Sequence, residues 1–173
     1  MKKGNHYESA FQNLLDQRAL PYVAVNENHR AAFAEVKLKS FDFLVYLPSQ
    51  RNLLVDIKGR KSKPSKNDWL FDPWVGREDI DALENWQEIF GKSFAAAFVF
   101  AFWLCDFNHV QMFEPFRYQD HYYRFYAIYL DDYKKYMKPR SAKWNTITIP
   151  RGVFHELAWD LDQFLTDLSP PKQ

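Results

Sequence analysis

Two neighbouring stretches of the chain have the apolar, β-branched and aromatic composition of short β-strands. They cover residues 41–47 and 53–58, and residues 48–52 between them contain the Pro, Ser and Asn of a turn. This order predicts a β-hairpin. Residues 94–104 are apolar without alternation, which predicts a central strand covered on both faces. Two further strands are expected over 22–27 and 122–130.

Apolar residues at helical spacing occur in three other segments. Near the N-terminus, Asn5 is expected to cap a helix that ends before Leu20-Pro21. A second helix is expected over 79–90 and a third, amphipathic helix over 152–168, packed on the sheet. Strands and helices in this order predict an α/β fold with a mixed central sheet flanked by helices.

The length of 173 residues suits one domain with a substantial core, so the whole chain, 1–173, is expected to form a single unit. Its core is expected over about 4–130, and 169–173 reads as a frayed tail. The longest apolar run is too short to span a bilayer, and no signal peptide is visible, so a cytoplasmic protein is expected. A single cysteine excludes an internal disulfide and a cysteine-built zinc site.

The predicted hairpin carries charged residues where apolar ones are expected. Because side chains alternate along a strand, Asp56 and Lys58 share a face with Leu54. Asp42, on the other strand, is expected near Asp56. Two crowded carboxylates repel each other, and a divalent cation is the usual remedy. The alternatives are that Asp56 and Lys58 form a simple ion pair, or that both lie exposed on an edge strand.

The order of these residues resembles the PD-(D/E)XK nuclease superfamily. An acid on the first helix, an acid on a strand and then Asp-x-Lys on the next strand are all present between about residues 4 and 104. The N-terminal run from His6 to Phe11, HYESAF, is also similar to the signature of the bacterial HYExAFE family, with Gln12 in place of its last Glu. The resemblance implies a restriction-endonuclease-like core.

The resemblance also implies a metal site and its chemistry. Asp42 and Asp56 would ligate Mg²⁺ (or Mn²⁺), and the carbonyl of Ile57 would be a further oxygen ligand. The cation would lower the pKa of a bound water and neutralise charge on the phosphorus. Lys58 would lie beside that water, helping to orient or deprotonate it and stabilising the charge on the phosphate.

Glu8 is the expected third acid of this catalytic group. In resolvase-like members of the superfamily, the first-helix acid orders a second metal or a metal-bound water. The alternative for Glu8 is a purely local role, because it also stands where a capping-box acid would stand. Glu35 is the reserve candidate.

Nucleic-acid contacts must come from local clusters of positive charge, since the net charge of the chain is only +1. A basic loop is expected over 59–67, and residues 133–144 interleave basic and aromatic residues. Either segment could instead be an ordinary exposed loop. The candidate contact residues are Arg60, Lys61, Lys63, Lys66, Lys134, Lys135, Arg140 and Lys143.

The sequence thus predicts a metal-dependent nuclease that hydrolyses phosphodiester bonds of DNA (or RNA), and the resemblance allows a homodimer. Neither H-E-x-x-H nor G-x-S-x-G occurs, and glycine-rich nucleotide-binding patterns are absent. Two alternatives stay open. One is a catalytically inactive nuclease-fold module that binds nucleic acid or a protein partner. The other is an unrelated interaction domain with an Asp56–Lys58 ion pair.

Overall fold

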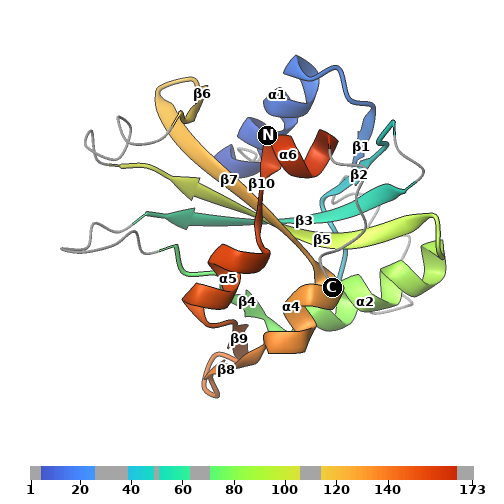
Figure 1. Ribbon diagram of the computed structural model, residues 1–173, viewed down its shortest axis with the longest axis vertical. Helices are drawn as coiled ribbons and strands as arrows, with labels where there is room; N and C mark the ends of the chain where they lie inside the picture. Colours follow the sequence, from blue (N-terminus) through green and yellow to red (C-terminus); the bar gives the residue numbers. More distant parts are fainter. Residues whose placement is uncertain (1–4, 26–38, 49–50, 63–70, 106–113, 167–173) are drawn as a thin grey trace.

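The computed structural model describes residues 5–25, 39–48, 51–62, 71–105 and 114–166. Its centre is a seven-stranded sheet in the order β1-β2-β3-β5-β7-β10, with β6 paired to β7 (Figure 1). Strands β3 and β5 are parallel, and every other pairing in this sheet is antiparallel. The strands are β1 (Tyr22–Ala24), β2 (Phe43–Val45), β3 (Asn52–Lys61), β5 (Phe94–Trp103), β6 (Phe116–Tyr118), β7 (His121–Tyr129) and β10 (Trp159–Asp160).

Helices cover both faces of this sheet. Helices α1 (His6–Gln17) and α6 (Leu161–Thr166) pack on one face, whereas α2 (Arg77–Phe90), α4 (Leu130–Tyr136) and α5 (Arg151–Leu157) pack on the other (Figure 1). A smaller sheet lies beside the start of α2 and has the order β4-β9-β8. Its strands are β4 (Val75–Gly76), β8 (Lys138–Ser141) and β9 (Thr146–Thr148). Within the described ranges, no helix is long and apolar enough to cross a membrane.

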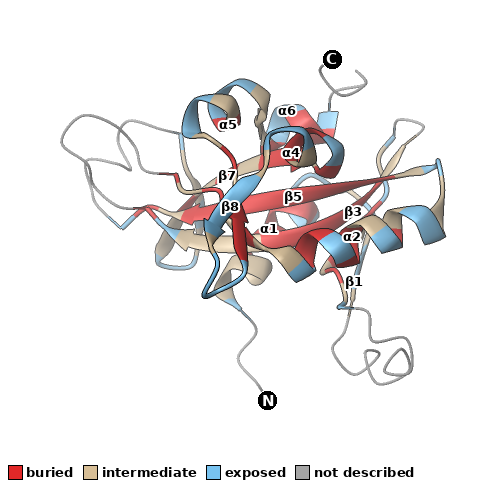
Figure 2. Cartoon of the chain, turned by 90° about the horizontal axis from the view of Figure 1, so that it is seen from below, coloured by how far each residue is buried: buried red, intermediate tan, exposed pale blue. Residues whose placement is uncertain are grey.

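Strand β5 is buried along most of its length (Figure 2), as its uninterrupted apolar sequence predicts, and its two faces belong to two separate core clusters. Alanine and valine side chains point toward α1 and α6, and three phenylalanines, Phe98, Phe100 and Phe102, point toward α2 and α5. The small side chains on one face let the helices approach the sheet closely, while the large rings fill the other side. Both faces of β5 are therefore buried from solvent, as expected for a central strand.

The predicted hairpin over 41–58 is confirmed, because β2 and β3 pair antiparallel with Phe43 opposite Val55. Strand β3 is longer than expected. The prediction that Arg60 and Lys61 belong to a loop is wrong, since parallel pairing with β5 continues to Lys61 opposite Trp103. The rest of that basic segment, including Lys63 and Lys66, lies outside the described residues, as does Glu35.

The single C-terminal helix predicted over 152–168 is also wrong. Helices α5 and α6 are separated by β10, which pairs with β7 at the edge of the sheet. Phe154 on α5 packs against one face, whereas Phe164 on α6 packs against the other. The helical spacing was real, but its two halves serve opposite faces. The exposed loop that the sequence left open as an alternative for 133–144 is not found, since α4 and β8 cover most of that segment.

Candidate active site at the end of the hairpin

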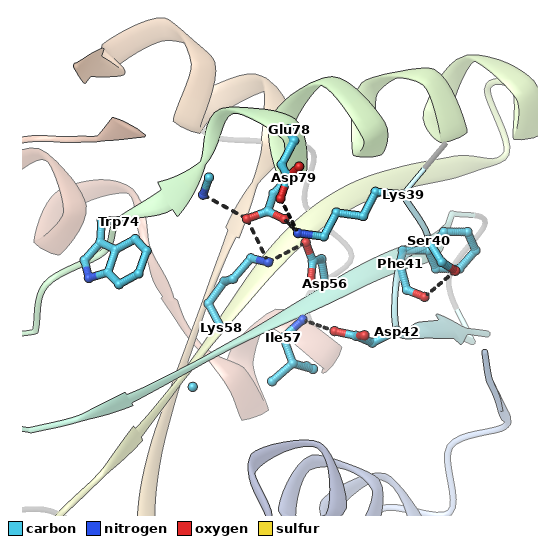
Figure 3. A network of polar contacts seen from close by, with 12 residues as sticks. Lys39, Ser40, Phe41, Asp42, Asp56, Ile57, Lys58, Trp74, Glu78 and Asp79 are labelled. Carbon is cyan, nitrogen blue, oxygen red and sulfur yellow. Dashed lines mark hydrogen bonds and ion pairs between the residues drawn. The ribbon is translucent and has the colours of Figure 1, made fainter. Parts of the chain in front are cut away.

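Asp42 lies at a bend immediately before β2, and its backbone is fixed from two sides. Its carbonyl accepts a hydrogen bond from Val25 N (2.8 Å), and its own N–H donates to the Val55 carbonyl (2.9 Å). Its side chain satisfies a backbone donor of β3, because Oδ2 accepts a hydrogen bond from Ile57 N at 2.7 Å, where a neighbouring strand would otherwise supply a carbonyl (Figure 3). The carboxylate is thereby held against the edge of β3.

The residues that precede Asp42 in the sequence pack on α2. The ring of Phe41 packs edge-on against Trp86, with centroids 5.5 Å apart, and it also contacts Phe90. The Trp86 indole N–H donates to the Lys39 carbonyl at 2.9 Å. The helix that follows β3 therefore sets the position of the first acid of the site.

Asp56 and Lys58 project from the same face of β3, as strand alternation predicts. Lys58 Nζ lies 2.9 Å from Asp56 Oδ2, and the two side chains are only 12% and 10% exposed. The ion pair that the sequence offered as an alternative is therefore present. It does not stand alone, because Asp42 lies within interaction range of Asp56 and shifts its pKa.

Asp79 is the residue that sequence reasoning missed. Its Oδ2 lies 3.0 Å from Lys58 Nζ and accepts from Gly76 N at 2.8 Å, while its other oxygen binds Lys39 Nζ (Figure 3). An acid three residues after a helix-capping position is a readable capping signal. Nothing in the local sequence shows that this cap also holds Lys58.

The three aspartates differ in electrostatics. Burial raises the pKa of Asp56 to about 8, and the charges of Asp42 and Asp79 add to this although Lys58 opposes it. Burial also raises the pKa of Asp42, with a contribution from the charge of Glu8, against the hydrogen bond from Ile57 N. For Asp79, burial is outweighed by Lys58 and Lys39, so its pKa is lowered.

The site gathers buried charges of both signs. Among the described residues, the carboxylates of Asp42, Asp56 and Asp79 interact with one another and with the cations Lys39, Lys58 and Arg60, and the charge of Glu8 lies near Asp42. Buried charge that is not fully compensated is costly and favours uptake of protons or of a cation.

The oxygen donors at this edge suit a hard divalent cation. Asp42 and Asp56 supply two carboxylates, and the Ile57 peptide faces Asp42 because its N–H bonds that side chain. In a strand the N–H and C=O of one residue point to the same side, so the Ile57 carbonyl lies on this edge too. Within the described ranges, no three His, Cys, Asp or Glu side chains form a ready metal-binding group. Mg²⁺ keeps several water ligands, so two carboxylates and a carbonyl fit it.

The first helix brings Glu8 toward these groups. Asn5 caps α1 by accepting from Tyr7 N at 3.2 Å, and its amide donates to Glu8 Oε1 at 3.3 Å. Glu8 is close enough to Asp42 for its charge to raise that pKa. Tyr7, the neighbour of Glu8, packs directly on the backbone of Gly59 in β3, where an added Cβ would lie only 2.1 Å from the Tyr7 ring. This contact holds the start of α1 against β3. Glu8 thus bonds the side chain of the capping residue and its charge lies near Asp42, while its role as the third acid stays a prediction.

His6 seats the same end of α1 on β7. Its Nδ1 lies 2.6 Å from the hydroxyl of Tyr123, which is fully buried. Burial, with His121 and Lys61 nearby, lowers the pKa of His6. The consecutive residues His6, Tyr7 and Glu8 thus each have a separate contact.

The predicted nucleic-acid contacts on β3 lie next to the site. The Arg60 guanidinium stacks 3.8 Å from the ring centroid of Trp74 and donates to the Trp74 carbonyl. Lys61 Nζ lies 4.6 Å from the ring centroid of Trp103. Both cations therefore lie on aromatic rings at the exit of the strand that carries Lys58.

The remaining described candidates divide into two groups. Lys134 and Lys135, on α4, pair with Glu84 and Asp132. Those pairs reduce the charge available to a partner. On the smaller sheet, Arg140 pairs with Asp72 at 3.2 Å and also lies over Trp74, while Lys143 lies over Trp144.

Comparison with known proteins identifies the fold. No protein-family model matches the sequence, so the HYExAFE resemblance has no support from that comparison, and no curated protein sequence matches either. A crystal structure of Hjc, a Holliday junction resolvase from the archaeal hyperthermophile Archaeoglobus fulgidus, is similar with a TM-score of 0.54. The match has 12% sequence identity and covers 98% of this chain and 100% of that chain. The predicted mixed α/β, restriction-endonuclease-like fold is confirmed.

Proposed function

We propose that this protein is a divalent-metal-dependent nuclease that hydrolyses phosphodiester bonds of nucleic acid, DNA in the first instance. The observation that carries the proposal is the meeting of Asp42, Asp56 and Lys58 at one edge of β3, where Asp42 replaces a strand partner and Lys58 lies 2.9 Å from Asp56. The nuclease-like fold supports the same conclusion.

In this proposal Asp42 and Asp56 hold Mg²⁺ or Mn²⁺, and the Ile57 carbonyl is a further ligand. When bound, the cation lowers the pKa of water and offsets negative charge on the phosphate. The protein supplies a rigid pair of carboxylates for it. The backbone hydrogen bonds of Asp42 and its bond from Ile57 N fix one of them, and pairing of β3 with β5 fixes the other.

Lys58 provides positive charge for the scissile phosphate and orients the attacking water. Its side chain is held between Asp56 and Asp79, so its Nζ has a defined position. Preorganised charge of this kind is worth far more in a water-poor site than in solvent. Asp79 is thus a positioning residue that acts through Lys58. Glu8, from α1, adds a carboxylate near Asp42 that orders water on that side.

The alternative is a module that keeps this fold and binds nucleic acid or protein without cutting. The structure offers one observation in its favour, the direct Lys58–Asp56 contact, which would also exist in a site used only for stability. Both acids and the lysine lie in one group, and the pKa values of Asp42 and Asp56 are raised by burial, a cost that a bound cation would offset; this favours the nuclease.

A cleavage assay separates the two. The purified protein is incubated with end-labelled single-stranded DNA, duplex DNA, a four-way junction and RNA, in Mg²⁺ or Mn²⁺ against EDTA. Metal-dependent cutting that is lost in Asp56→Asn supports the nuclease. No cutting of any substrate, with binding retained, would leave the inactive module as the function.

A further inference from the structure

Basic residues are concentrated in and around the hairpin of the smaller sheet. Residues 133–151 contain six basic residues and no Asp or Glu, within a chain of net charge +1. We call residues 138–148, which form β8, the turn and β9, the basic hairpin. The six basic residues of the wider segment are Lys134, Lys135, Lys138, Arg140, Lys143 and Arg151, of which Lys134, Lys135 and Arg140 pair with Glu84, Asp132 and Asp72.

The basic hairpin and β3, the strand that carries Asp56 and Lys58, each place an arginine over the same aromatic ring, that of Trp74. Trp74 carries the guanidinium of Arg60 at 3.8 Å and that of Arg140 at 5.1 Å from its ring centroid. Arg60 follows Lys58 by two residues, so the two side chains share one face of β3. Arg140 belongs to β8. Cations therefore continue from the catalytic lysine to the hairpin.

The tip of the hairpin presents a large aromatic side chain to solvent. Trp144 is 71% exposed, the highest value among the exposed large hydrophobic residues of the described chain. Lys143 Nζ lies 5.3 Å from its ring centroid. An exposed indole beside cations suits the face of a nucleobase and the phosphate that follows it.

The turn that carries Trp144 is held in place. Trp144 N donates to Ser141 Oγ at 3.3 Å, and the Asn145 carbonyl accepts from Arg77 N, at the start of α2, at 3.0 Å. Asn145 has φ 46°, a conformation that Asn tolerates better than most residues. Because α2 also carries Asp79, one helix positions both the hairpin tip and Lys58.

We propose that the basic hairpin binds an unpaired stretch of the nucleic-acid strand that is cut at Lys58, with Trp144 stacked on one of its bases. The inference rests on the proposed function and names its substrate class. Bases inside a duplex are already stacked on their neighbours, so Trp144 can use its ring only on an unpaired base. The lack of acids in the segment favours a phosphate backbone over a protein partner.

The test is fluorescence anisotropy in EDTA with labelled single-stranded, forked and blunt duplex DNA. Trp144→Ala is expected to weaken binding of the single strand and the fork by about tenfold and to leave the blunt duplex unchanged. Lys138→Ala and Lys143→Ala are expected to weaken all three and to reduce the salt dependence by about one counterion each. Tyr46→Ala and Lys92→Ala are matched controls, since both residues are exposed and neither belongs to the smaller sheet.

Binding in EDTA does not depend on metal or on catalysis, so the two proposals fail separately. Tight single-strand binding that needs Trp144, without cutting in Mg²⁺, would contradict the nuclease and keep this inference. Equal single-strand binding by Trp144→Ala and the parent protein, with melting temperatures unchanged, would overturn it. Tighter binding of the blunt duplex than of the single strand would overturn it as well.

Discussion

Asp79 Oδ2 lies 3.0 Å from Lys58 Nζ, and this ion pair links the first turn of α2 to β3. The same lysine lies 2.9 Å from Asp56, so it is held from two sides. Both aspartate side chains are at most 10% exposed. These two buried ion pairs fix the position of the Lys58 ammonium group. The free energy lost by removing the charges from water is offset only when such pairs have good geometry.

Asp79→Asn is expected to lower the rate of metal-dependent cleavage by about tenfold, because Lys58 loses one of its two anchors. The Asn side-chain oxygen can still accept from Gly76 N, so the helix cap is kept, but stability at neutral pH should fall because the charge that pairs with Lys58 and Lys39 is lost. Loss of the Asp79 charge also lowers the pKa of Asp56. The acid limb of the pH–rate profile should therefore move to lower pH.

The matched control is Glu78→Gln, one residue earlier on α2. Glu78 contacts Lys39 at 3.1 Å with a side chain that is 74% exposed. Its substitution should leave the rate and the pH profile unchanged. If both variants behave alike, or if Asp79→Asn is slow with an unshifted pH profile, Asp79 has only a structural role.

The metal-free protein should lose stability as pH rises through the range in which Asp56 titrates. Its pKa is about 8 when folded and about 3.9 in an unfolded chain, so between these values the folded state holds a proton that the unfolded state has released. Asp56→Asn removes this penalty. In EDTA its free energy of unfolding relative to the parent should therefore rise from pH 5 to pH 8, by about 1 kcal/mol or more.

Urea unfolding at the two pH values measures this difference. Asp81→Asn, at an exposed position of α2, is the control and should show no such change. A difference between Asp56→Asn and the parent that stays constant across pH would mean that Asp56 does not take up a proton on folding.

Mg²⁺ or Mn²⁺ should raise the melting temperature, because a ligand that binds only the folded state stabilises it by mass action. At a hundred times the dissociation constant the gain is about 2.7 kcal/mol. Asp42→Asn and Asp56→Asn should each abolish the gain, whereas Asp81→Asn should keep it. A gain that persists in both variants would place the cation elsewhere.

Gly59→Ala should destabilise the fold by about 1–3 kcal/mol, since its Cβ would overlap the Tyr7 ring and force α1 away from β3. Tyr7→Ala in the same chain should recover part of that loss. The comparison is Gly152→Ala in α5, where nothing lies within 4 Å of the added Cβ. There the change should be neutral or stabilising, because Ala favours a helix. Chemical denaturation of these three variants is the measurement, and equal free energies of unfolding for Gly59→Ala and Gly152→Ala would contradict a close approach of Tyr7 to Gly59.

The hairpin and its charged residues could be predicted because each signal is local. Alternation along β3 placed Asp56 and Lys58 on one face, and the turn at 48–52 placed Asp42 near them. The cap at Asn5 was readable for the same reason. These features depend on residues close together in the sequence, where the spacing of apolar residues and the presence of turn-forming residues predict the structure.

The features that were missed depend on contacts between distant elements. Asp79 reads as a helix cap, and its bond to Lys58 exists only once α2 packs on β3. The C-terminal apolar residues keep helical spacing, yet β10 divides them because Phe154 and Phe164 belong to opposite faces of the sheet. Arg60 reads as part of a loop, but β5 extends β3 far enough to include it.

The most direct test of the central claim is the single-turnover cleavage rate of Lys58→Ala against Lys61→Ala, in Mn²⁺ and in EDTA, on the best substrate of the panel. Both variants remove one lysine from β3, but only Lys58 lies between Asp56 and Asp79. With protein in saturating excess over the nucleic acid, so that weaker binding does not limit the rate, the account predicts metal-dependent cutting that falls by at least about a hundredfold in Lys58→Ala and less than about threefold in Lys61→Ala. Cutting that Lys58→Ala retains, or that persists in EDTA, would contradict it.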